Sequence, residues 1–446
     1  MADEAEKQVE AALVAWVRQA APYIHSFRGR TFVIAFGGEV LGTDKAQALA
    51  QDFNLLASLG IRLVLVHGAR PQIDAEMQRR GLPVSFHDGL RITDAAALEC
   101  VKSAMGVARI EIEALLSQGL PNTPMAGAWM RITGGNFITA KPVGVLDGVD
   151  HLYTGAVRKV NAEEITADLD QQNVVLISPL GVSPSGEIFN LATEEVAEAV
   201  AIALQADKLI FLCDAPGVVN RKGLLLESVT ADEAEALLAR NVPQAPEIRR
   251  VLVEAVRACR AGVERVHFLD RMADGAMLME FFTRAGVGTM LARSGLVSLR
   301  EATVDDVGAI LALIAPLEAD GTLVKRGRER IEMEIGHFSL LEDDGVVVGC
   351  AALYPFKARR GEMVGELACL AVMADYRHCG YGDQLRKHIE ARAKKHKLKK
   401  LFVLTTRTAH WFIERGFIES DISALPEGKR ELYNYQRRSK VLLKPL

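Results

Sequence analysis

Residues 377–382 read RHCGYG, a short loop after the apolar run ELACLAV (366–372) and directly before the helical pattern GDQLRKHIEARAKKH (382–396). Glycines let the backbone approach a ligand closely, and free N–H groups at a helix start attract phosphate oxygens. The order of strand, glycine turn and helix therefore predicts a phosphate-binding turn. The R-x-x-G-x-G spacing alone is a weak signal, because an ordinary tight turn also fits it.

The pattern around this stretch predicts two α/β domains. A chain of 446 residues is too long for one compact core. Residues 31–292 alternate short apolar runs with helical stretches, which is typical of a mainly parallel sheet. From Val297 the pattern changes to a strand, a helix opened by acidic residues, and a hairpin about Asp344 and Gly345. We predict one domain over residues 1–293 and a smaller one, with a mixed sheet, over 297–446.

The overall composition favours a cytoplasmic protein with small-molecule partners. Its formal net charge of -4 gives no global attraction to nucleic acid or membrane. An acidic N-terminus does not fit an export signal, and no apolar run approaches the length of a membrane span. Six cysteines lie far apart without a C-x-x-C pair, which argues against disulfides and a cysteine zinc site. We expect no metal.

The order of elements in the C-terminal domain resembles the GNAT acyltransferase family over about 150 residues. The glycine turn, the strand LFVLTT (401–406) and the helix ending in the ERGF turn (414–417) carry this resemblance. It implies acetyl-CoA as cosubstrate, with pantetheine along the strand before the turn and the pyrophosphate held by the turn. The residues implied to bind it are Cys369, Leu370, Val372, Arg377, Gly380, Tyr381 and Gly382.

Two further segments, LFVLTTRTAHWFIERGF (401–417) and LYNYQRRSKVLL (432–443), resemble the bacterial N-acetylglutamate synthases. This resemblance implies Glu366 as a general base acting through water, and Thr405 as a hydroxyl near the coenzyme sulfur. A carboxylate facing solvent is the alternative reading for Glu366. Many GNAT members have a tyrosine where this chain has Phe412, so Thr405, water or another group must protonate the departing thiolate.

The implied amino acid substrate, L-glutamate, has two carboxylates, which arginine side chains can hold in bidentate fashion. By resemblance, Arg326 in GTLVKRGRER (321–330) and Arg437 with Ser439 occupy the glutamate-binding positions, and Leu323 contributes backbone contacts. The neighbouring basic residues leave the register open. Lys325 or Arg438 are alternatives to these two arginines.

Residues 31–292 resemble the amino acid kinase family, especially N-acetylglutamate kinase, and imply a kinase-like α/β sandwich. The resemblance rests on FVIAFGGEVL (32–41), LVLVHGARPQID (63–74), LISPLGVSPSGEIFNL (176–191) and FLCDAPGV (211–218). These kinases carry a lysine where this chain has Ala35, and their second lysine lies in a glycine-rich approach that here reads PEIRRV (246–251). Phosphoryl transfer depends on positioning and charge neutralisation, so we expect a catalytically silent domain.

Two segments of this domain, APYI (21–24) and EFFTRAGVGT (280–289), resemble the signature of arginine-sensitive kinases and synthases. They imply an allosteric L-arginine site. Tyr23 would close on the ligand and Glu280 would pair with its guanidinium group. The direction of the effect, feedback inhibition, is implied by the family. The residues of the implied site are Tyr23, Lys208, His267, Glu280, Gly286 and Gly288.

The function implied by these resemblances is acetylation of L-glutamate by acetyl-CoA, the first step of arginine biosynthesis. The alternatives are an ATP-dependent N-acetylglutamate kinase and a non-enzymatic arginine sensor. The missing lysine at Ala35 argues against the kinase, and the intact Arg377, Glu366 and Thr405 argue against the sensor. The family resemblance also implies a homo-oligomer, a hexamer. The N-terminal helix, with Trp16 and Val17 on its apolar side, is a candidate for the pairing surface.

Overall fold

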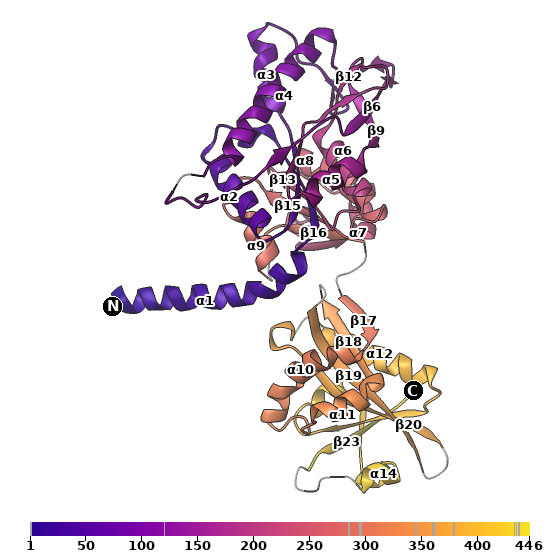
Figure 1. Cartoon of the computed structure of the whole chain (residues 1–446). Coiled ribbons are helices and arrows are strands. Elements are labelled where there is room, and N and C mark those ends of the chain that lie inside the picture. The colour runs from indigo at the N-terminus through magenta and orange to yellow at the C-terminus, as the bar shows by residue number, and fades with distance from the viewer. Residues whose placement is uncertain are drawn as a thin grey trace. The chain divides into compact units, whose positions relative to one another are not determined.

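The computed structural model describes residues 2–119, 121–283, 286–293, 297–343, 346–358, 362–377, 380–431, 433, 435 and 438–446. The chain separates into two compact units, Met1–Ser294 and Gly295–Leu446 (Figure 1). Each unit has its own sheet and its own buried apolar clusters.

The first unit is built on an eight-stranded sheet in the order β14-β16-β15-β13-β1-β2-β10-β5. Its neighbouring strands run parallel, except that β15 and β16 are antiparallel. This arrangement confirms the predicted mainly parallel sheet. The strands are β1 (Thr31–Phe36), β2 (Arg62–His67), β5 (Ile132–Thr133), β10 (Val174–Ile177), β13 (Lys208–Cys213), β14 (Ser228–Thr230), β15 (Arg265–Asp270) and β16 (Thr289–Ala292).

Helices cover both faces of this sheet because alternate side chains of each strand point to opposite faces. In β1, Phe32, Ile34 and Phe36 join one apolar cluster, while Val33 and Ala35 join the other. The first cluster includes side chains of α1 (Ala2–Phe27), α2 (Asp44–Ser58), α4 (Ala95–Leu116) and α9 (Ala276–Phe282). The second includes side chains of α5 (Ala162–Asp170), α6 (Thr193–Ala203), α7 (Ala231–Ala239) and α8 (Pro246–Arg260).

Smaller elements complete the first unit above the ends of the central strands. A second sheet has the order β12-β11-β6-β9, and two short hairpins lie beside it. The helix α3 (Arg70–Arg79) packs against α4. These strands are β3 (Phe86–His87), β4 (Leu90–Arg91), β6 (Ile138–Pro142), β7 (Val145–Leu146), β8 (Val149–Asp150), β9 (Gly155–Val160), β11 (Leu180–Val182) and β12 (Ile188–Asn190).

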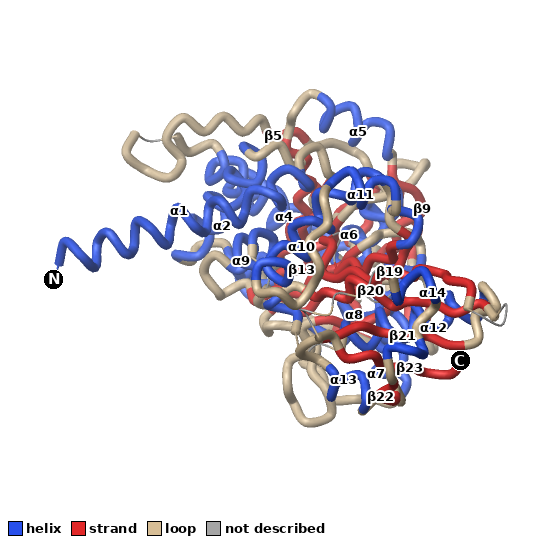
Figure 2. Tube along the Cα trace, turned by 90° about the horizontal axis from the view of Figure 1, so that it is seen from below, coloured by secondary structure: helices blue, strands red, loops and turns tan. Residues whose placement is uncertain are grey.

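The first helix, α1, extends away from the body of the first unit (Figures 1 and 2). Its C-terminal part packs against that unit through Ala20, Tyr23, Ile24 and Phe27. Phe27 lies against Phe281 and Phe282 of α9, at ring centroid distances of 6.3 and 6.0 Å. Trp16 and Val17 are exposed on the extended part.

The second unit has a seven-stranded sheet in the order β17-β18-β19-β20-β21-β23-β22. Only β20 and β21 run parallel, and the other neighbours are antiparallel. This confirms the predicted mixed sheet. The strands are β17 (Val297–Glu301), β18 (Phe338–Asp343), β19 (Val346–Lys357), β20 (Met363–Val372), β21 (Lys400–Thr405), β22 (Ile418–Ser420) and β23 (Lys440–Pro445), and the helices are α10 (Val307–Ala319), α11 (Arg328–Met333), α12 (Tyr381–Lys395), α13 (Ala409–Ile413) and α14 (Glu427–Arg430).

The strands β20 and β21 pair over only three residues of each, from Val364 to Glu366 on β20. Beyond Glu366, β20 continues to Val372 without β21 as a partner. On its other side, the register between β19 and β20 shifts near Cys369, which has a φ of +51°. Such a bulge bends a strand and re-aims its side chains. The C-terminal half of β20 therefore leaves backbone hydrogen-bonding groups for a partner other than β21.

Candidate active site

Glu366 is the last residue of β20 that pairs with β21, and its side chain is 6% exposed. Its Oε2 atom lies 2.7 Å from the Nζ atom of Lys429 on α14. The alternative reading, a carboxylate that faces solvent, is therefore wrong. A buried charge needs a partner, and the ammonium group of Lys429 provides one.

Arg326 is held beside Glu366 by a chain of polar contacts. Its Nη1 atom donates to the Tyr354 hydroxyl over 2.8 Å, and that hydroxyl donates to Glu334 Oε2 over 2.6 Å. Tyr354 is also the Cα partner of Glu366 across β19 and β20. Burial alone would lower the pKa of Arg326, but the nearby Cys369, Tyr354 and Glu366 raise it. The guanidinium group is therefore fixed and charged at the edge of the bulge.

The Thr405 side chain is buried at the end of β21. Its Oγ1 atom accepts a hydrogen bond from the Thr408 backbone N–H over 3.1 Å and lies 2.9 Å from Thr408 Oγ1. The hydroxyl is thus oriented by the turn into α13. Phe412 of α13 is buried against Trp411 and Phe417, so its ring belongs to the core.

The described part of the glycine turn leads directly into α12. Gly380 has a φ of +78°, a conformation that favours glycine, and α12 begins at Tyr381 without a side-chain cap. A Cβ atom on Gly382 would lie 3.4 Å from the Trp411 ring. Free N–H groups at the start of a 15-residue helix suit a pyrophosphate. The residues of the turn therefore fit the coenzyme, and His378 and Cys379 lie outside the described residues.

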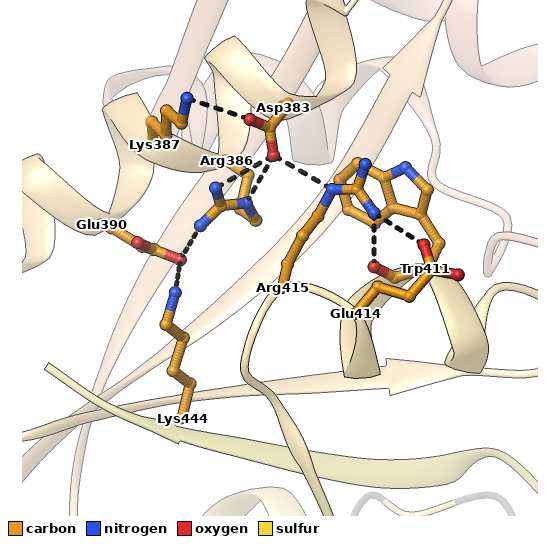
Figure 3. A network of polar contacts seen from close by, with 8 residues as sticks. All are labelled: Asp383, Arg386, Lys387, Glu390, Trp411, Glu414, Arg415 and Lys444. Atoms are coloured by element: carbon orange, nitrogen blue, oxygen red, sulfur yellow. Dashed lines mark hydrogen bonds and ion pairs between the residues drawn. The ribbon is translucent and has the colours of Figure 1, made fainter.

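A charged network fixes the start of α12 against α13 (Figure 3). Asp383 accepts hydrogen bonds from Arg386 Nη2 over 2.9 Å and from Arg415 Nε over 3.0 Å. The Arg415 guanidinium group lies over the Trp411 ring, 4.1 Å from its centroid. Glu390 joins Arg386 to Lys444 of β23. Trp411 is thereby held against the glycine turn.

The remaining implied coenzyme residues lie on both sides of the bulge. Cys369 is buried, and burial raises the pKa of its thiol to about 11, so it stays protonated near neutral pH. Leu370 and Val372 are half-buried at the C-terminal end of β20. The Tyr381 hydroxyl donates to Asp343 Oδ2 over 3.0 Å, and Arg377 is exposed.

The implied glutamate-binding residues are only partly described. Arg437 lies outside the described residues. Ser439 is buried, and its carbonyl oxygen accepts a hydrogen bond from the Tyr433 hydroxyl over 2.6 Å. Leu323 precedes α11 in the same loop as Arg326, and its backbone N–H donates to Leu317 over 2.7 Å.

In the first unit, the implied arginine-site residues form a buried polar chain. Lys208 Nζ lies 3.2 Å from His267 Nε2, and His267 Nδ1 lies 2.7 Å from Glu280 Oε1. Glu280 Oε2 also accepts from the backbone N–H groups of Val287 and Gly288. A Cβ atom on Gly286 would lie 2.7 Å from that carboxylate. The loop of residues 286–288 is therefore closed onto Glu280.

Burial and charge shift the ionisation of this chain. Burial lowers the pKa of Lys208 to about 7, and burial with the nearby Lys208 lowers that of His267 to about 4. Burial would raise the pKa of Glu280, but the His267 contact and the backbone donors lower it to about 2. A neutral His267 can donate from Nδ1 to Glu280 and accept at Nε2 from Lys208.

Aromatic rings surround this polar chain and connect it to α1. The Lys208 Nζ atom lies 5.1 Å from the centroid of the Phe27 ring, and the His267 ring meets Phe281 edge-on at 5.4 Å. Tyr23, one turn before Phe27 on α1, is half-buried, with its ring 6.2 Å from the Phe27 ring. The six implied arginine-site residues therefore gather in one region of the first unit.

The kinase-like crevice is also present in the first unit. A cavity of about 730 Å³ lies at the C-terminal ends of the central strands and is lined by Ala35, Gly37 and Gly38. Its buried Arg271 is paired with Glu247 at 2.7 Å, so this cation is already neutralised. The segment 246–251 begins α8 instead of a glycine-rich loop. Other acidic residues that line the cavity are Glu39, Asp88, Glu194, Glu195, Asp214 and Glu254.

Sequence reasoning missed three residues of the candidate active site in the second unit, namely Tyr354, Glu334 and Lys429. They contact Arg326 or Glu366 from separate elements, 28, 8 and 63 residues away along the chain. Nothing in a local spacing pattern points to such contacts. A buried tyrosine hydroxyl and a lysine beside a strand carboxylate become visible only in three dimensions.

Within the residues that the structure describes, no group of three or more His, Cys, Asp or Glu side chains is placed to hold a metal ion. The same described residues include no helix long and apolar enough to cross a membrane.

Comparison with known proteins agrees with both units. The amino acid kinase family matches residues 30–270, and the acetyltransferase (GNAT) family matches residues 313–417. Two proteins named amino-acid acetyltransferase are similar over 97% of this chain. The one from Ralstonia nicotianae is 50% identical with 95% of its length covered, and the one from Azotobacter vinelandii is 51% identical with 99% covered.

Two solved structures of N-acetylglutamate synthase from Neisseria gonorrhoeae are similar over 97% of this chain and 99% of theirs, at 40% identity. One, complexed with coenzyme A and L-arginine, has a TM-score of 0.89. The other, complexed with coenzyme A and N-acetyl-glutamate, has a TM-score of 0.62. These similarities and the two family matches confirm the predicted combination of domains, and the chain belongs to the N-acetylglutamate synthase family of amino-acid acetyltransferases.

Proposed function

We propose that this enzyme transfers the acetyl group of acetyl-CoA to the amino group of L-glutamate, releasing coenzyme A and N-acetyl-L-glutamate. The observation that carries the proposal is the convergence of Glu366 and Arg326 beside the bulge of β20. A buried carboxylate and a fixed guanidinium group there lie next to the part of β20 that does not pair with β21. The similar proteins named amino-acid acetyltransferase support the same reaction.

The proposed catalytic roles follow from the side chains. Acetyl-CoA supplies an activated thioester, with its pyrophosphate on the turn of Arg377, Gly380 and Gly382. Glu366 accepts a proton from the substrate ammonium group through water, which frees the nitrogen lone pair for attack. The thiolate that leaves takes a proton from Thr405, from water or from another group. Thr405 is oriented for this role by its contacts with Thr408.

Substrate selection rests on charge. Arg326 is proposed to hold one carboxylate of L-glutamate and Arg437, with Ser439, the other. Two cations in the substrate site would discriminate against neutral amino acids, because a buried cation left unpaired is costly. The structure of the Neisseria gonorrhoeae enzyme complexed with N-acetyl-glutamate supports a product of this class.

The first unit is proposed as a regulatory domain over residues 1–293 and the second as the acetyltransferase domain over 297–446. L-Arginine binds the region of Tyr23, Lys208, His267 and Glu280 and inhibits the enzyme. The similar structure complexed with L-arginine supports this ligand. Ala35 in place of lysine, together with the pairing of Arg271 with Glu247, supports the loss of phosphoryl transfer.

The proposed setting is the cytoplasm, and the proposed assembly is a homo-oligomer, a hexamer by family resemblance. Five described cysteines are buried free thiols, which supports a reducing compartment. The exposed Trp16 and Val17 on the extended helix α1 support contact with another copy.

The test measures free thiol released from acetyl-CoA with L-glutamate, D-glutamate, L-aspartate and L-glutamine, each with and without L-arginine. Of these four amino acids, we expect only L-glutamate to give thiol release, and we expect L-arginine to suppress that release. ATP-dependent phosphorylation of N-acetylglutamate, measured in parallel, would support the kinase instead. Arginine binding without thiol release from any amino acid would support the sensor.

A further inference from the structure

Lys429 contacts the proposed base and has no role in the reaction described above. Its Nζ atom lies 2.7 Å from Glu366 Oε2, and the two side chains are 20% and 6% exposed. The lysine comes from α14, in the segment between β22 and β23. Such a pair is shielded from solvent, so its electrostatic effect is larger than that of a surface pair.

Packing of the surrounding segment holds Lys429 in this place. Leu425, just before α14, is buried in a cluster with Val364 of β20, Phe402 of β21 and Val441 of β23. Tyr433, just after α14, packs against the same cluster. Its hydroxyl donates to the Ser439 carbonyl oxygen. Both ends of the segment are therefore anchored to the sheet, and α14 carries Lys429 to Glu366.

Among the described residues, Lys429 is the cation that contacts Glu366. Arg326 lies nearby in the loop before α11, but its Nη1 donates to Tyr354 and lies 4.0 Å from Glu334. Cys369 on β20 is a protonated thiol, and Tyr354 on β19 is a hydroxyl whose pKa burial raises further. Among the described residues, the charged and titratable groups that the contacts place near Glu366 are Lys429, Arg326, Tyr354 and Cys369.

We propose that Lys429 is a positioning residue that holds the Glu366 carboxylate in the orientation that accepts the proton of the substrate ammonium group. The proposal rests on the proposed function. In the step, an N–H bond of the substrate breaks and an O–H bond forms on Glu366 through water, while Lys429 neither gains nor loses a proton. Its contact with Oε2 fixes the direction in which the carboxylate points.

The test compares kcat and KM for L-glutamate in the wild type, Lys429→Met, Lys429→Arg and the control Lys440→Met. Lys440 pairs with Glu419 at 3.0 Å, but both side chains are more than half exposed. We expect Lys429→Met to lower kcat by about tenfold or more with KM for L-glutamate nearly unchanged, since a misplaced catalytic group lowers the rate more than substrate binding. Lys429→Arg should restore most of kcat.

Separate outcomes identify which idea fails. A Lys429→Met enzyme with the kcat of the wild type would overturn the proposal. A higher KM for glutamate with kcat unchanged would show that Lys429 binds the substrate instead. Thermal unfolding of each variant shows whether it is still folded. If Lys429→Met is not, the activity of Lys429→Arg tests the proposal in its place. Absence of thiol release by the wild type would refute the proposed function itself.

Discussion

Each unit of this chain places a glycine turn near the end of a buried strand, but the charges around the two turns differ. Gly37 and Gly38 face a cavity in which Arg271 is neutralised by Glu247 and Ala35 stands where the kinases have lysine. The turn at Gly380 and Gly382 opens a helix in a unit that also fixes Arg326 beside a carboxylate. Apolar packing preserves a fold without preserving its chemistry, because the core does not depend on the charged side chains that react.

The same contrast separates the two buried carboxylates. Glu280 accepts three hydrogen bonds, from His267 and from two backbone N–H groups. Its pKa of about 2, which burial opposes and these bonds produce, keeps it ionised at any ordinary pH. Glu366 has one ion pair, with Lys429, and lies beside the proposed substrate site. A carboxylate held by many fixed donors serves binding and structure, whereas one held by a single cation can still accept a proton.

The largest expected effect comes from removing the carboxylate of Glu366, the proposed general base. Glu366→Gln should lower kcat/KM by about 10²–10⁴, the usual contribution of general-base catalysis. Thiol release at saturating acetyl-CoA measures it, with Glu419→Gln, on an exposed strand residue, as control. An unchanged rate would mean that Glu366 is not the base, and the contrast with Glu280 would then disappear.

The next effect concerns stability in the first unit. The pKa of His267 is lowered from 6.5 to about 4, so between these values the folded state binds fewer protons than the unfolded state. The free energy of unfolding therefore falls as pH falls through this window, by about 3 kcal/mol for this group. His267→Gln should remove that part of the fall.

Urea unfolding of the full chain at pH values from 4 to 7 measures this dependence. The exposed His25, changed to Gln, is the matched control and should leave it unaltered. If His267→Gln and the wild type lose stability in parallel, the buried chain does not carry the acid sensitivity of this unit.

A third variant tests whether Glu280, which accepts three hydrogen bonds in the structure, also binds L-arginine. Glu280→Gln should raise the arginine concentration for half-inhibition by about 10–150-fold, since a lost hydrogen bond between charged groups costs about 1.5–3 kcal/mol. Inhibition curves at fixed substrate concentrations measure the change. Glu235→Gln, at an exposed pair with Arg260, is the control. Equal inhibition of Glu280→Gln and the wild type would confine Glu280 to a structural role.

The smallest expected effect concerns substrate selection in the second unit. Arg326→Lys keeps the charge but loses the planar pair of donors, so KM for L-glutamate should rise about tenfold, or about 1.4 kcal/mol. Initial rates over a glutamate series measure it, against Arg328→Lys at an exposed pair with Glu332. A rise of the same size in both variants would contradict the assignment of Arg326.

Sequence patterns were sufficient for the main elements because the central strands are continuous apolar runs. Residues 31–36, 62–67 and 208–213 are almost wholly buried, and a buried parallel strand has few polar positions. The short strands β6 to β9 were not predicted. They are short and partly exposed, so they lack both a buried run and a long alternation.

The site was predictable only where a residue lies within a recognisable motif. Glu366 and Arg326 are parts of such segments, and the structure brings them together. Lys429 and Tyr354 reach them through long-range contacts, and neither position follows from periodicity. The role of Arg437 stays a prediction, because that residue lies outside the described residues.

Because β20 does not pair with β21 beyond Glu366, this edge of the strand is available to the cosubstrate. Pantetheine contains amide groups, which can pair with a strand edge as a short peptide does. A molecule lying there would act as an additional strand, and the sheet would reach its full hydrogen-bonded width only in the complex. Amide exchange in residues 367–372 would then slow in proportion to occupancy, so the rigidity of this edge would report affinity without any turnover.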